Sequence, residues 1–279
     1  MSGSRLKILV IAALVFINAV FLAVIISDNT ADAQNERKAL ENVCSVMQNG
    51  GIMINPDDVR TSGVLRTMRT ARSDQAEAII ARAVLGETVM TDQGVIYLYE
   101  NAERGIAEFY SGCDFEIRVN AGVIPSSEGA SRTVRRLLRD MRLETAELFT
   151  EGEPGGETVT AVSAYKGASI FNCAIEFVFS GGSLQTVKGR YMTGAVPAED
   201  GAEISRAGTA LLGFFAAVRN EDKEDVDCSQ IYGVEAGYSH RVVGSFGEGV
   251  ISPAWLITTD TGIYIMEDLS GEIRLVGQA

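Results

Sequence analysis

The sequence predicts an α+β fold class, in which an N-terminal transmembrane helix precedes two or three units of a helix packed on an antiparallel sheet. Three observations predict it. Residues 8–26 contain a single polar side chain, Asn18. Beyond them, segments with the helical period alternate with segments in which apolar residues recur at every second position. These blocks follow in the order helix then strands, three times, which favours helices on antiparallel sheets over a parallel βαβ fold.

The segment 8–26 is long enough to cross a bilayer, because its nineteen residues extend about 28 Å as a helix. Two basic residues precede it and two aspartates follow it. The positive-inside bias predicts a cytoplasmic tail, residues 1–7, and a cell-membrane protein whose C-terminal part is extracytoplasmic. A cleaved signal peptide is the alternative, since residues 31–33 read Ala-Asp-Ala, although the apolar run exceeds the usual length of about 7 to 15 residues. Either way, the remaining chain is exported.

Two helices and a meander are predicted next. Apolar residues recur at i, i+3, i+4 and i+7 from Leu40, which predicts a helix from about residue 35 to 48 before an Asn-Gly-Gly stop. A second helix is predicted from Asp74, a capping residue, to Gly86. Between residues 87 and 120 the period changes to two, which predicts a β-meander.

The second half repeats this order. A third helix is predicted around Val134–Met141, capped by Ser126, Ser127 or Ser131. In the following strands, residues 180–183 read Ser-Gly-Gly-Ser and predict a hairpin turn. Residues 204–218 predict a fourth helix and residues 231–276 a last block of strands. The Gly- and Glu-rich stretch 151–157 predicts a boundary between two extracytoplasmic α+β lobes, residues 27–150 and 157–279.

Charge limits the partners. The formal net charge is −13 at pH 7, and a chain repelled by phosphates is a poor candidate for nucleic acid. Anionic lipid headgroups would repel it as well. We therefore expect the apolar N-terminal helix, and no basic patch, to hold the chain at the membrane.

The four cysteines indicate no metal site. None of Cys44, Cys113, Cys173 and Cys228 has a Cys or His neighbour at the spacing of a zinc ligand pair. Two disulfides with three possible connectivities are one alternative, and four buried thiols are the other. The sequence predicts no cofactor.

Motifs for catalysis are weak. Residues 163–166 read Ser-Ala-Tyr-Lys, an S-x-x-K match, but they lie in a strand-like block without S-D-N or K-T-G elements. His240 is the only histidine, and with no G-x-S-x-G motif we expect an ordinary loop residue at a strand end. Two carboxylates in a cleft could hydrolyse a glycan, yet the sequence does not pair them. No nucleotide-binding motif is found. We predict that the chain is not an enzyme, with no catalytic, cofactor-binding or metal-binding residue.

The C-terminal stretch is the most distinctive. It contains a Pro-Ala-Trp strand at 253–255, a second strand with Gly262 and Tyr264, and a Ser-Gly-Glu-Ile turn at 270–273. Together with the N-terminal segment, it resembles the YycI family of membrane-anchored regulators, and PepSY-like modules share the same ending. The four cysteines, the few lysines and the glycines at 152–156 depart from that family. The resemblance implies a non-catalytic extracytoplasmic regulator of a cell-envelope sensor histidine kinase in a two-component system, with a related YycH-like anchored regulator as a second partner.

A different class of function remains open. A PepSY-type module would inhibit or chaperone an exported peptidase, or bind envelope peptide. If the regulator contacts its partner within the membrane, small residues would allow a close approach of helices and one amide could donate a hydrogen bond. Alanines are also merely common in such helices. The candidate contact residues are Ala12, Asn18, Ala19 and Ala23.

Overall fold

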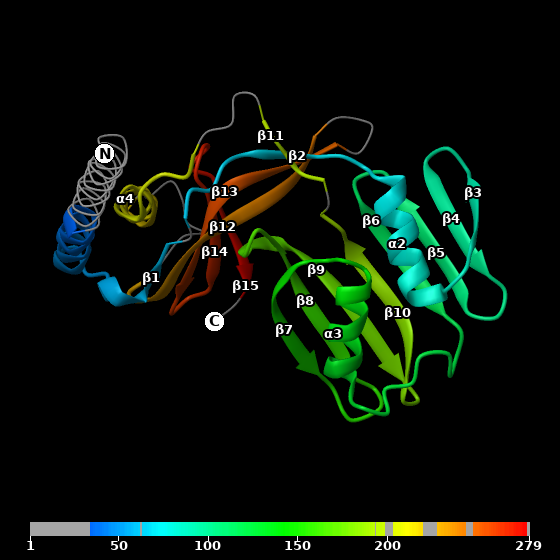
Figure 1. Cartoon of the computed structure of the whole chain (residues 1–279). Helices are drawn as coiled ribbons and strands as arrows, with labels where there is room; N and C mark the ends of the chain where they lie inside the picture. The colour runs from blue at the N-terminus through cyan, green and yellow to red at the C-terminus, as the bar shows by residue number, and fades with distance from the viewer. Residues whose placement is uncertain are drawn as a thin grey trace, which may run out of the picture.

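The structure is a computed structural model that describes residues 34–61, 63–192, 194–198, 203–219, 228–243 and 248–277. The strands of this part form one 15-stranded sheet (Figure 1). The helical segments are 34–49, η1 (Pro56–Asp58), α2 (Asp74–Leu85), α3 (Ala130–Asp140) and α4 (Ala207–Val218). The strands are β1 (Val59–Arg60), β2 (Met68–Thr70), β3 (Val89–Asp92), β4 (Ile96–Asn101), β5 (Gly105–Tyr110), β6 (Asp114–Val119), β7 (Thr145–Glu151), β8 (Thr158–Tyr165), β9 (Ala168–Ser180), β10 (Ser183–Arg190), β11 (Val196–Pro197), β12 (Ile231–Val243), β13 (Glu248–Thr259), β14 (Ile263–Glu267) and β15 (Ile273–Gly277).

One hydrophobic cluster lies between strands β3–β10 and the helices α2 and α3, which cover the same face of these strands (Figure 1). Its centre is aromatic. Phe109 stacks on Phe115, with ring centroids 5.7 Å apart, and meets Tyr99 edge to face at 5.4 Å. Residues of this cluster run from Ile80 to Tyr191. This first cluster therefore includes β7–β10 as well as the meander.

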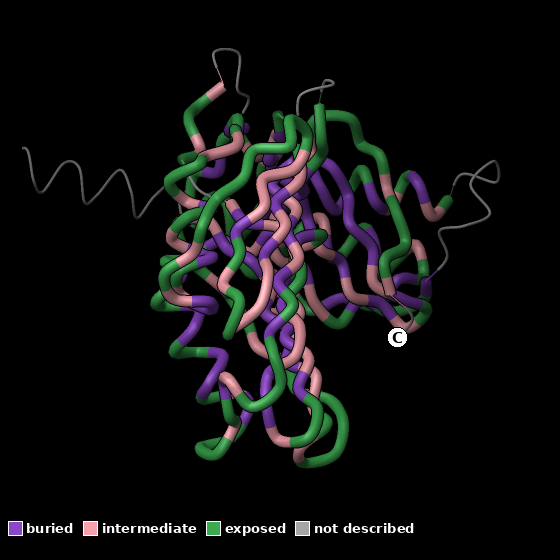
Figure 2. Tube along the Cα trace, turned by 90° about the vertical axis from the view of Figure 1, so that its right-hand side faces the viewer, coloured by how far each residue is buried: buried purple, intermediate pink, exposed green. Residues whose placement is uncertain are grey.

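A second hydrophobic cluster lies between the strands β12–β14 and the pair formed by helix 34–49 and α4. Phe214 of α4 meets Tyr264 of β14 edge to face, with centroids 5.6 Å apart. Trp255 of β13 is 1% exposed and belongs to this cluster. Buried and exposed positions alternate along the strands (Figure 2).

β9 joins the two clusters. Its C-terminal half pairs antiparallel with β8 and β10, whereas Ile170 near its start pairs in parallel with Tyr238 of β12. Gly237 permits this approach, because a Cβ there would lie 2.6 Å from the carbonyl oxygen of Ser169 and collide with the ring of Phe171. The sheet is continuous across the molecule for this reason.

The predicted fold class is therefore wrong. The sheet is single and mixed, with β12 parallel to both β1 and β9, and it replaces the separate antiparallel units expected from the sequence. Within the described ranges, no helix is long and apolar enough to cross a membrane. The predicted anchor 8–26, with Ala12, Asn18, Ala19 and Ala23, lies outside those ranges.

Most individual elements are confirmed. Helices occur at 34–49 and as α2, α3 and α4, the meander is β3–β6, and residues 180–183 turn between β9 and β10. The caps differ, since Ser73 caps α2 and Gly129 stands at the N-cap of α3 without a side-chain bond. The predicted boundary at 151–157 falls in the turn between the paired strands β7 and β8, and the division into lobes stays a prediction.

Candidate functional site

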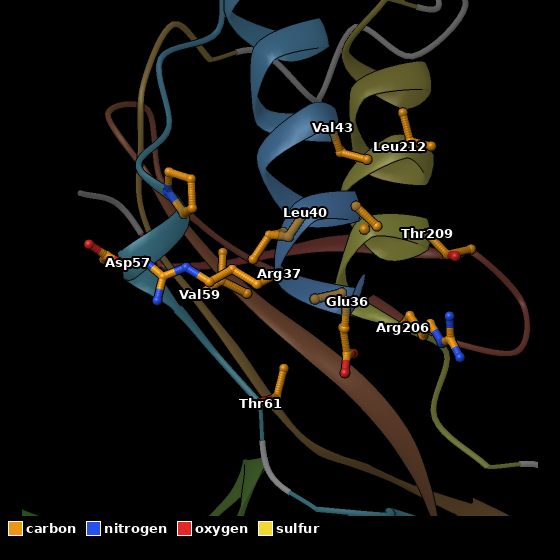
Figure 3. A pocket seen from close by; sticks show the side chains of 14 residues that line it. Glu36, Arg37, Leu40, Val43, Asp57, Val59, Thr61, Arg206, Thr209 and Leu212 are labelled. Carbon is orange, nitrogen blue, oxygen red and sulfur yellow. Dashed lines mark hydrogen bonds and ion pairs between the residues drawn. The ribbon is translucent and has the colours of Figure 1, made fainter. Parts of the chain in front are cut away.

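A groove opens where helix 34–49, α4 and the η1–β1 segment meet (Figure 3). Its volume is about 580 Å³, within the usual range of small-ligand and peptide sites. We call it the helix groove. It is lined by Glu36, Arg37, Ala39, Leu40, Val43, Pro56, Asp57, Val59, Thr61, Arg206, Ala207, Gly208, Thr209 and Leu212.

Small residues bring the two helices of the groove together. A Cβ on Gly208 would lie 3.4 Å from Val43, and a Cβ on Gly50 would collide with the ring of Phe215. The helices therefore touch along one side, where Cys44 and Met47 are buried with Leu211 and Phe214 in the second cluster. The groove lies on the solvent side of this contact.

The floor of the helix groove is apolar. Leu40 and Val43 come from helix 34–49, and Leu212 comes from α4, where it is 44% exposed. Val43 points from helix 34–49 toward α4, on which Leu212 stands (Figure 3). The exposed part of this leucine is apolar surface that remains available to a bound group.

The rim of the groove is charged. Arg37 donates from Nη2 to Oδ1 of Asp57 at 3.1 Å and from Nε to Glu41 at 3.3 Å. Glu36 and Arg206 lie at one end (Figure 3), and neither forms an ion pair with another described residue. An apolar floor with one negative and one positive group at its end suits a peptide segment that has an apolar anchor.

The residues that the sequence singled out for catalysis are not brought together. Ser163 of β8 is 4% exposed, and its hydroxyl has no hydrogen-bond partner among the residues that the structure describes. The ammonium of Lys166 instead lies over the ring of Tyr165, 5.4 Å from the centroid. The S-x-x-K pattern therefore forms no nucleophile and base pair.

The prediction that His240 is a loop residue at a strand end is wrong. The residue is buried within β12. Its Nδ1 lies 2.8 Å from Nη1 of Arg190, and its backbone exchanges two hydrogen bonds with the side chain of Asn172. Burial, with a further contribution from the Arg190 charge, lowers the pKa of His240 to about 4. The ring is neutral at pH 7. The contacts of His240 position β12 against β9 and β10.

A second buried ionic cluster joins α2 to the sheet. Glu77 is fully buried and accepts hydrogen bonds from Arg72 at 2.6 and 3.1 Å and from the hydroxyl of Tyr191 at 2.8 Å. The guanidinium of Arg72 also lies 3.5 Å from the centroid of the Tyr97 ring. Glu77 and Tyr191 are fully buried, so this cluster supports the fold.

All four cysteines lie in the described part, where they are buried and form no disulfide. Burial raises the pKa of Cys173 to about 12 and that of Cys113 to about 11, so neither is a reactive thiolate. No group of three or more His, Cys, Asp or Glu side chains that could hold a metal ion occurs among the described residues.

No protein-family model matches the sequence, and no curated protein matches it. A crystal structure of an uncharacterized protein from Eubacterium rectale ATCC 33656 is 9% identical and covers 80% of this chain and 92% of that chain, with a TM-score of 0.49. The C-terminal domain of YpeB from Bacillus megaterium is 13% identical and covers 75% of this chain and 100% of that chain, with a TM-score of 0.35. At such TM-scores neither likeness assigns a family or a function.

The sequence could not indicate the helix groove. Its walls come from residues 36–61 and 206–212, which are far apart along the chain. Leu40 and Val43 have the spacing of a core-facing stripe, and only the position of α4 leaves part of that stripe uncovered. A weak signal exists in Leu212, which follows the buried Leu211 of α4 and points away from the core.

Proposed function

We propose that the protein is a non-catalytic regulator that acts outside the cytoplasm at the cell membrane by binding a segment of a signalling protein in the helix groove. The single observation that carries this proposal is the groove itself, with its exposed leucine floor and charged rim. Grooves between helices commonly take an apolar segment of a partner.

The proposed partner is a cell-envelope sensor histidine kinase, and a related YycH-like regulator is the second. Both come from the resemblance of the C-terminal stretch to YycI. Regulation requires that the groove bind one signalling state of the kinase more tightly than the other, because a ligand shifts an equilibrium only by its difference in affinity.

The test is recovery of partners from the native membrane. The full-length protein is cross-linked mildly, purified and analysed for co-purifying proteins. Leu212→Glu should lower recovery of the kinase at least tenfold, because it places a charge on the apolar floor. Leu269→Glu is the matched control, since Leu269 is 58% exposed in the turn after β14 and lies outside the groove.

Each outcome is decisive. Loss of the kinase with Leu212→Glu alone supports the proposal, whereas equal recovery from both variants contradicts the role of the groove. Recovery of an exported peptidase in place of a kinase would contradict the regulator function and favour the alternative, an inhibitor or chaperone of that peptidase. Asn18→Leu tests separately whether the N-terminal segment contributes to the association.

A further inference from the structure

α3 has one apolar and one basic side. Val134, Leu137 and Leu138 are buried against the sheet. The other side carries arginines at i, i+3, i+4 and i+7, with one more after the helix, and all five side chains are exposed. We call this side the arginine face: Arg132, Arg135, Arg136, Arg139 and Arg142.

The arginine face is almost without counter-charges. Arg139 contacts the adjacent Asp140 at 3.7 Å, and the other four make no ion pair or side-chain hydrogen bond with any described residue. Like charges at i, i+3 and i+4 destabilise a helix by about 0.2–0.5 kcal/mol per pair. The concentration is unusual in a chain with a formal net charge of −13.

The basic zone is short. From Arg132 to Arg142 the chain advances about 15 Å along a helix. Glu128 precedes the zone and Glu144 follows it. Glu144 accepts hydrogen bonds from the backbone amides of Lys166 and Gly167 at 2.9 and 2.6 Å, and it forms no ion pair with the arginines in the described part of the chain.

The short length of the basic zone favours one kind of partner. A flat anionic surface such as a membrane would meet the acidic remainder of the chain together with the arginines, because charges within about 8 Å still interact at physiological salt. A narrow carboxylate-rich segment would meet the arginines alone. Guanidinium groups also bind carboxylates bidentately, which adds geometric selectivity.

We infer that the arginine face docks a short carboxylate-rich segment of a partner protein. This surface is separate from the helix groove, since α3 lies at the other end of the molecule from helix 34–49 and α4 (Figure 1). The inference therefore does not depend on what the groove binds.

The probe is a helical peptide that carries glutamates at i, i+3, i+4, i+7 and i+10 on an alanine background, with a glutamine version as its control. The full chain in detergent should bind the glutamate peptide, more weakly as salt rises, and should not bind the glutamine peptide. Arg135→Glu/Arg136→Glu should weaken this binding at least tenfold at physiological salt.

The matched variant is Arg69→Glu/Arg241→Glu, which makes the same change in net charge at two exposed arginines on either side of Val250. It should retain binding within about twofold, because Arg69 and Arg241 lie on β2 and β12, which are outside the cluster that α3 covers. Circular dichroism and thermal unfolding check that both variants fold.

Three results would overturn the inference. Equal weakening by the two variants would mean that only net charge matters. Failure of the glutamate peptide to bind would exclude a carboxylate partner. The third result is that the wild type binds phosphatidylglycerol vesicles but not the glutamate peptide, and that Arg135→Glu/Arg136→Glu abolishes the vesicle binding. This result would assign the arginine face to a membrane surface instead.

Discussion

Arg190 donates from Nη1 to Nδ1 of His240 at 2.8 Å, and this bond crosses between the strands of the two hydrophobic clusters. The same guanidinium binds both carboxylate oxygens of Asp114, at 2.8 and 2.9 Å. A guanidinium has no acceptor, so Nδ1 must accept and the imidazole proton must reside on Nε2. His240 is thus neutral and fixed in one tautomer.

The first prediction concerns acid stability. The pKa of His240 falls from 6.5 to about 4 on folding, so between these values the unfolded chain binds a proton that the folded chain does not. The stability that neutral His240 provides is complete above about pH 6.5 and is lost as the pH falls toward 4, by up to about 3 kcal/mol. Urea unfolding at pH 7 and pH 5 measures this loss.

His240→Asn is the control for this measurement, because its amide oxygen can still accept from Arg190 while the residue does not titrate. The variant should lose less stability than the wild type between pH 7 and pH 5. Nitrogen NMR of the single imidazole should show the Nε2–H tautomer at pH 6, and a protonated ring at that pH would contradict the assignment.

The second prediction concerns the buried carboxylate of Glu77. Glu77→Ala leaves the guanidinium of Arg72 with no anionic partner in the interior, and we expect a loss of about 3–5 kcal/mol in the free energy of unfolding. Burial raises the pKa of Tyr191, so its hydroxyl also remains a donor without its acceptor.

Glu87→Ala is the comparison, since the Arg82–Glu87 pair is 67% and 86% exposed and should be worth less than about 1 kcal/mol. Denaturant titration of both variants measures the difference. Similar losses would show that the Glu77 cluster does not anchor α2.

The third prediction uses two glycines of the same strand. A Cβ at Gly237 would collide with Phe171 and the backbone of β9, whereas one at Gly233 has open space around it. Gly237→Ala should therefore cost about 1–3 kcal/mol, and Gly233→Ala should cost less than about 1 kcal/mol. Thermal unfolding of the two variants compares them, and equal midpoints would contradict a close approach of β9 to β12.

The fourth prediction concerns the cysteines. All four cysteines are buried and none forms a disulfide within the described residues, so a thiol reagent at pH 8 should modify essentially none in the native protein and four per chain in denaturant. Reducing agents should leave the unfolding midpoint unchanged. Fast modification of one thiol in the folded state would show that the region around it opens.

Local patterns predicted the helices and the meander well. The apolar stripe of α2, for example, lies within its own sequence. The mixed sheet could not be predicted in this way, because the partner of Ile170 is Tyr238 and no period in either strand identifies the other. Parallel pairing also leaves no turn between the strands as a signal.

His240 was missed for a related reason. Residues 236–240 of β12 are buried without interruption, so the strand lacks the alternation that would identify it, and its polar residues look like a loop. Their partners are Asn172 and Arg190 for His240, and Glu267 and Arg274 for Ser239. These partners lie at least 28 positions away along the chain.

β9 gives the molecule a mechanical property. Its 13 residues span about 43 Å at about 3.3 Å per residue, and its two ends are fixed in different hydrophobic clusters. A hinge between the clusters would have to bend this strand or break its ladders. A force applied at helix 34–49 is therefore carried along β9 as tension, and the strands beneath α2 and α3 must turn with it.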